Sequence, residues 1–86
     1  MMKSIGIPLD HVTKGSSLFI LEIPEGRSRE RLIRLGILTG QSIKCIERLP
    51  GGTVVIEKNR QEIAIGATLA KTIRVAYASA QGKRRE

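Results

Sequence analysis

Apolar residues recur at helical spacing in one segment of the chain, which begins at Arg29. Leu32 and Leu35 lie three residues apart, so a helix places both on one face, with Ile33 beside them. Ser28 precedes the segment and is a residue type that accepts a backbone N–H bond at a helix N-terminus. The pattern therefore predicts a short helix that is capped by Ser28 and turns its two leucines to the core.

Two glycines mark the end of this helix and of the loop that follows it. Gly36 comes directly after the last periodic residue, where a left-handed backbone ends a helix at little steric cost. Ile37 and Leu38 are expected to return to the core, and Gly40 is expected to turn the chain into the next strand. Leu32, Leu35, Gly36 and Gly40 are thus the predicted structural positions of this segment.

The apolar residues in the rest of the chain follow strand patterns separated by turn residues. The first strand is nearly all apolar, so we expect it to be covered on both faces. Ile63 and Ile65 alternate with polar residues and are expected to point inward. Short strands at this spacing are typical of a small barrel, here mainly β with one helix inserted after the first strand. The five predicted strands are 18–23, 41–48, 53–57, 62–65 and 72–75, with a helical turn at 67–70.

Length and charge add the expected domain limits. With 86 residues and a net charge of +7, the chain suggests one small basic domain. We expect a flexible N-terminus at residues 1–6, the barrel at 7–76, and a disordered basic tail at 77–86. No apolar run approaches the ~20 residues that span a bilayer. The lone cysteine, Cys45, fits a reducing compartment, and we therefore expect the cytoplasm.

Candidate chemistry is sparse. Asp10 and His11 are adjacent and form the best weak site for Fe²⁺ or another divalent transition metal, but a tight site needs three or four ligands. Cys45 is expected to be a small core residue. One histidine without a nucleophile partner makes no catalytic triad, and no phosphate-binding glycine loop is present. We therefore expect no enzyme activity and no tightly bound cofactor.

Residues 31–40, with the sequence RLIRLGILTG, resemble the R-L-x-x-L-G-[ILM]-x-x-G motif of the ferrous iron transport protein A (FeoA) family. The similarity continues through Pro50–Gly52 and the strands that follow, to Val75. The resemblance implies an SH3-like barrel and a cytoplasmic accessory role in bacterial ferrous iron uptake. It also implies a partner, the membrane ferrous iron transporter FeoB, with its cytoplasmic GTPase region as the contact.

A barrel of this type without an aromatic groove cannot hold proline-rich peptides in the usual way. We therefore expect docking through the helix and neighbouring loops. A solvated arginine face, a metal-binding sensor module and a small nucleic-acid-binding barrel remain as alternatives. Nucleic acid is the weakest interpretation of the arginine cluster because stacking aromatics are lacking. The predicted docking residues are Arg29, Arg31, Arg34, Pro50, Gly51 and Gly52.

Overall fold

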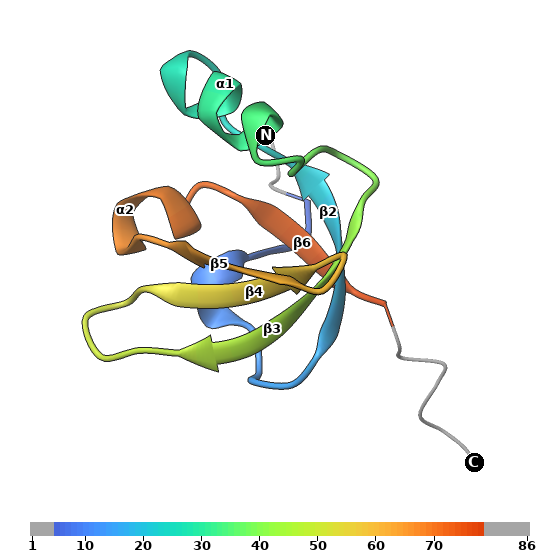
Figure 1. Ribbon diagram of the computed structural model, residues 1–86, viewed down its shortest axis with the longest axis vertical. Coiled ribbons are helices and arrows are strands. Elements are labelled where there is room, and N and C mark those ends of the chain that lie inside the picture. The colour runs from blue at the N-terminus through green and yellow to red at the C-terminus, as the bar shows by residue number, and fades with distance from the viewer. Residues whose placement is uncertain (1–4, 79–86) are drawn as a thin grey trace.

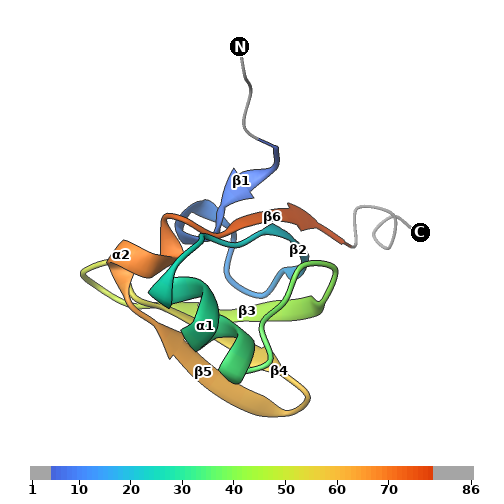
Figure 2. The same ribbon diagram turned by 90° about the horizontal axis from the view of Figure 1, so that it is seen from above.

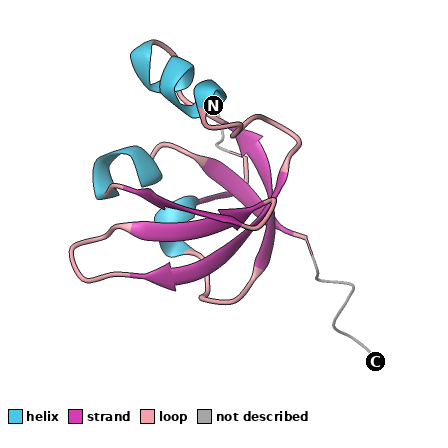
Figure 3. Cartoon of the chain, in the orientation of Figure 1, coloured by secondary structure: helices cyan, strands magenta, loops and turns pink. Residues whose placement is uncertain are grey.

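The computed structural model describes residues 5–78, which form a curled antiparallel sheet with a helix over one of its ends (Figure 1). The strand order is β1-β6-β2-β3-β4-β5. Strands make up most of the regular structure, as Figure 3 shows, and the predicted mainly β, SH3-like barrel is confirmed. The elements are β1 (Ile7–Pro8), the 3₁₀ turn η1 (Leu9–His11), β2 (Ser17–Glu22), α1 (Arg27–Arg34), β3 (Ser42–Arg48), β4 (Val54–Lys58), β5 (Gln61–Ile65), α2 (Ala67–Ala70) and β6 (Arg74–Tyr77).

The sheet has six strands in the described residues, one more than predicted. The additional strand β1 has two residues and pairs with β6, with Ile7 opposite Val75. The register shifts between Ile20 and Glu22 in β2, and again between Cys45 and Glu47 in β3. Such irregularities bend strands and increase their twist, and they allow a single sheet to curl around a core.

Aliphatic side chains fill the inside of the curled sheet. The strands supply them by alternation, as in β2, where Leu18 and Ile20 are buried while Phe19 is 43% exposed. The expectation that this strand is covered on both faces is therefore wrong. Among residues 5–78 no polar or charged residue is buried. The buried residues are Leu9, Val12, Leu18, Ile20, Ile23, Leu32, Ile37, Ile43, Cys45, Val54, Ile56, Ile65, Ala70, Ile73 and Val75.

The helix α1 begins two residues earlier than predicted. Gly26 is the N-cap, with a φ of 81°, and no side chain caps the helix. The carbonyl of Gly26 accepts the N–H groups of Arg29 and Glu30 at 3.0 and 3.3 Å. The predicted Ser28 cap is wrong because Ser28 already lies in the first helical turn.

The helix α1 ends before Gly36, as predicted. The hydrogen bonds around this glycine form a Schellman motif. This glycine has a φ of 84°, and its N–H donates to the carbonyl of Ile33 at 2.9 Å. The N–H of Ile37 donates to the carbonyl of Leu32 at 2.8 Å, and both of these side chains are fully buried. The predicted turn at Gly40 is also present, with a φ of 89° and an N–H bond to the carbonyl of Ile20 at 2.7 Å.

Leu32 is the only side chain of α1 that is buried. Leu35 is 44% exposed and Leu38 is 37% exposed, so the expectation that both face the core is wrong. Figures 1 and 2 show the reason, because α1 lies across one end of the curled sheet and not along its face. A helix in that position buries Leu32 against the core, whereas Leu35 at its C-cap stays largely exposed.

The limits of the domain differ by a little from those predicted. Tyr77 belongs to β6, where it pairs with Leu18, although the tail was expected to begin there. At the other end, the Arg74 guanidinium donates to the carbonyls of Ile5 and Gly6, both at 3.0 Å. The expectations for residues 1–4 and 79–86 lie outside the described residues.

Candidate functional site

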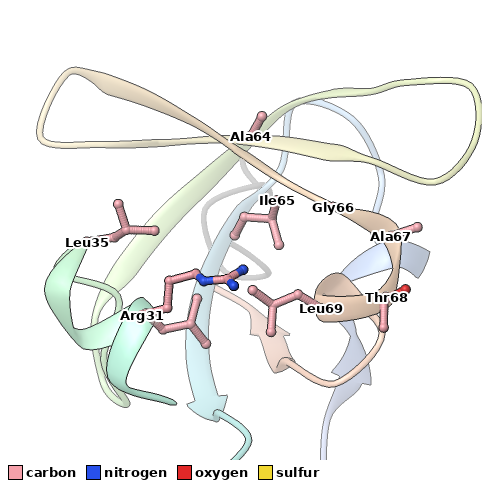
Figure 4. Close-up of a pocket in the computed structure, with 9 residues that line it drawn as sticks. Arg31, Leu35, Ala64, Ile65, Gly66, Ala67, Thr68 and Leu69 are labelled. Atoms are coloured by element: carbon pink, nitrogen blue, oxygen red, sulfur yellow. The ribbon is translucent and has the colours of Figure 1, made fainter. Parts of the chain in front are cut away.

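A groove runs between α1 and the segment that joins β5 to α2 (Figure 4). It has a volume of about 300 Å³. Ile65 is buried beneath it, and Leu35 of α1 and Leu69 of α2 lie on its two sides. Nine residues line it: Arg31, Leu32, Leu35, Ala64, Ile65, Gly66, Ala67, Thr68 and Leu69.

Small residues keep this groove open. Ala64, Gly66 and Ala67 form the stretch where β5 ends and α2 begins, and none has a side chain larger than a methyl group. Gly66 is the N-cap of α2, with an extended backbone. A Cβ added at Gly66 would meet nothing within 4 Å, so space is open at this position, whereas the Cβ of Ala67 lies towards Gly52.

Among residues 5–78, Arg31 is the only charged residue that lines the groove. In Figure 4 its side chain extends from α1 towards Ile65 and Leu69. Arg31 and Leu35 are four residues apart and so share one side of the helix. Within residues 5–78 no carboxylate forms an ion pair with Arg31. The groove thus offers an apolar surface with one guanidinium available to a ligand.

The predicted docking residues fall into two groups around this groove. Arg29, Arg31 and Arg34 are all exposed on α1, but only Arg31 lines the groove. The turn at Pro50–Gly52 lies on the far side of α2, where a Cβ added to Gly52 would be 2.8 Å from the Cβ of Ala67. The structure therefore places α2 between the two predicted groups.

Sequence reasoning did not identify the wall of the groove that α2 supplies. Residues 67–70 were expected to form a helical turn, and they do. Nothing in the local pattern indicates that Thr68 and Leu69 face α1, because that proximity arises from the curl of the whole sheet. The small residues around Gly66 are the only local signal that a side of the turn stays open.

The weak metal candidate lies on η1. The Asp10 Oδ1 atom is 3.9 Å from Nε2 of His11 and has no hydrogen-bond partner. Arg48 donates to the Asp10 carbonyl at 2.8 Å, so the backbone of this turn is held in place. No cluster of three or more His, Cys, Asp or Glu residues that could hold an ion occurs within residues 5–78.

Cys45 lies on the inner face of β3 and is fully buried. Burial raises the pKa of its thiol, and this effect outweighs the opposing influences of Arg48 and of backbone hydrogen bonds. A thiol of this kind is protonated near neutral pH and is a poor nucleophile or metal ligand. The structure places Cys45 in the core, as expected.

A second depression of about 360 Å³ lies beside the β4–β5 hairpin. Lys44, Lys58 and Arg60 contribute cationic groups to it, and Glu57 contributes a carboxylate. It is more open than the groove at α1 and mixes charges of both signs.

In the part of the chain that the structure describes, no helix is long and apolar enough to cross a membrane.

Fold and site together define a small SH3-like barrel whose interior is packed and whose hollows lie on its outer surface. The family model of the FeoA domain matches residues 7–77. The chain therefore belongs to the FeoA domain family, and family membership implies a role in ferrous iron transport.

Solved structures agree with this assignment. The crystal structure of an iron uptake regulatory protein, FeoA, is 26% identical, with a TM-score of 0.75, and the match covers 84% of this chain and 96% of that one. A FeoA-like protein from Clostridium acetobutylicum is also 26% identical, with a TM-score of 0.73 and 90% of each chain covered. No match was found among curated proteins.

A third similar structure belongs to a larger protein. ScaR with bound Zn²⁺ is 16% identical, with a TM-score of 0.81, and the match covers 91% of this chain. The chain spans only 40% of the length of ScaR. At this level of identity the likeness concerns the fold alone.

Proposed function

We propose that the chain is a cytoplasmic accessory protein of bacterial ferrous iron uptake that docks to the cytoplasmic GTPase region of the membrane transporter FeoB. The docking surface consists of α1, the groove beside it and the turn at Pro50–Gly52. The observation that supports this best is the groove itself, an apolar hollow lined by Arg31 on a barrel with a packed interior.

The exposed side chains of α1 are suited to a protein partner. Ile33 and Leu35 are each 44% exposed, and they alternate with the guanidinium groups of Arg31 and Arg34. Protein interfaces combine apolar anchors with arginine because both kinds of residue contribute strongly to the binding free energy. Positive charge on the helix also accelerates association with an acidic surface and makes the rate fall as salt increases.

An NMR titration of the ¹⁵N-labelled chain with the purified cytoplasmic region of FeoB tests this proposal. We expect amide shifts in α1, in α2 and at Gly51 and Gly52, with smaller changes at the β4–β5 hairpin, which is the internal control. Unchanged spectra at saturating partner would overturn the proposal. Shifts confined to the β4–β5 hairpin would show that the partner contacts the hairpin and not the proposed docking surface.

A weak Fe²⁺ site at Asp10 and His11 is the second candidate, favoured by the unpartnered Oδ1 atom next to the imidazole. Anaerobic titration with Fe²⁺, followed by paramagnetic broadening of the η1 amides, tests it. Broadening that disappears in His11→Ala supports the site, and unbroadened η1 signals at millimolar Fe²⁺ eliminate it.

A further inference from the structure

We propose that the groove between α1 and α2 binds a partner segment in which an aliphatic side chain lies next to a carboxylate, with Arg31 pairing with the carboxylate. The inference rests on the proposed docking to FeoB and extends it by naming the chemistry of the segment that enters the groove. Arg31 is then a recognition residue, and the other arginines of α1 act mainly through long-range charge.

The size of the groove argues for side chains of a peptide. Its volume of about 300 Å³ is at the lower end of the range for ligand pockets. One or two aliphatic side chains fill such a space. Leu35 and Leu69 on its sides, with Ile65 beneath, provide apolar contact to an inserted leucine, isoleucine or valine.

The charge of the groove argues for a carboxylate beside that side chain. The Arg31 side chain is exposed and lines the groove, so a carboxylate at the edge of the groove can reach its guanidinium. Its planar donors match a carboxylate with two parallel hydrogen bonds. Arg31 has no such partner within residues 5–78, and no acidic residue lines the groove to compete.

The charges on the neighbouring helix also favour an acidic segment in the groove. The helix Arg27–Arg34 has four arginines and a single acidic residue, Glu30. A segment with several acidic residues is therefore attracted to the whole helix, whereas a basic segment is repelled. The helix α2 has no charged residue, so the carboxylate has to enter from the side of α1.

The variants Arg31→Gln and Arg29→Gln separate recognition from general attraction. Both remove one positive charge from an exposed position of the same helix, but of the two only Arg31 lines the groove. Each is titrated by NMR with the FeoB cytoplasmic region, and folding is checked by circular dichroism. We expect Arg31→Gln to weaken binding about tenfold or more, and Arg29→Gln by less than about threefold. Arg31→Lys should restore only part of the loss.

Two blocked pentapeptides test the groove chemistry directly, acetyl-GLELG-amide and its counterpart with glutamine in place of glutamate. The glutamate peptide should shift the amides around Leu35 and Leu69 at millimolar concentration, and the glutamine peptide should require several-fold more. Loss of this difference in Arg31→Gln would support the pairing.

The outcomes distinguish the two proposals. If the wild-type chain does not bind the FeoB region but the glutamate peptide shifts the groove, the proposed partner is wrong and the groove chemistry stands. If the FeoB region binds wild type, Arg31→Gln and Arg29→Gln equally well, docking stands and the inference is overturned. If neither probe binds wild type, both are overturned.

Discussion

Truncation of Leu32 should remove the anchor that holds α1 on the barrel. Leu32 is fully buried and is the only buried side chain of the helix. Leucine-to-alanine changes in protein cores cost about 2.7–5.0 kcal/mol, depending on how far the site collapses. A helix with a single anchor at the end of a barrel can shift into the space, so we place Leu32→Ala at the lower end, about 3 kcal/mol.

Leu35→Ala is the matched control on the same helix. Leu35 is 44% exposed, so its truncation loses roughly half of the contact of a buried leucine, about 1 kcal/mol. Urea unfolding followed by far-ultraviolet circular dichroism suits a chain without tryptophan. Leu32→Ala should also lower Tm by about 12–24 °C. Equal losses for the two variants, or a loss below about 1 kcal/mol for Leu32→Ala, would refute this account of the helix.

Two further predictions concern the edge of the sheet and the core thiol. Gly6→Ala should cost about 2–3 kcal/mol, since the new Cβ would lie 2.5 Å from the carbonyl oxygen of Val75 at a φ of +65°. Relative to the wild type, the variant should show a larger increase in amide hydrogen exchange in β1 and β6 than in β3 and β4, which would confirm that the damage is local. Unchanged exchange rates in β1 and β6 would contradict it. Burial raises the pKa of the Cys45 thiol, so its contribution to stability is full below the ordinary thiol pKa and falls as pH rises above it. Urea unfolding at pH 7 and pH 10 should show a smaller decrease for Cys45→Ala than for wild type, and equal decreases would argue against this coupling.

The strands were predictable because alternation is a local property of the sequence. In β5 the alternation predicts that Ile63 and Ile65 point inward, and Ile65 is buried while Ile63 is partly buried and packs against the core. The strand β1 could not be found this way, since two residues carry no periodicity and their structure depends on pairing with β6. The local pattern thus predicts an element well when the element is long enough for its buried and exposed residues to alternate.

The errors about which residues of the helix segment face the core have one physical origin. Periodicity shows which residues share a side of a helix, but it does not show how much of that side lies over the core. Leu32 and Leu35 have the same spacing signal, and only the position of α1 at the end of the barrel makes one buried and the other exposed. The same exposure makes Leu35 available to the groove, which Arg31 also lines.

The packed interior connects stability to binding in this small barrel. Its core is filled by aliphatic side chains, so a partner has access only to the outer surface. In α1 the two roles fall on consecutive residues, because Leu32 is buried against the core while Arg31 extends into the groove. The depth of the groove depends on the distance between α1 and α2, and that distance depends on the Leu32 anchor. A Leu32→Ala protein that is still folded at low temperature should therefore bind the FeoB region more weakly, although Leu32 itself need not touch the partner.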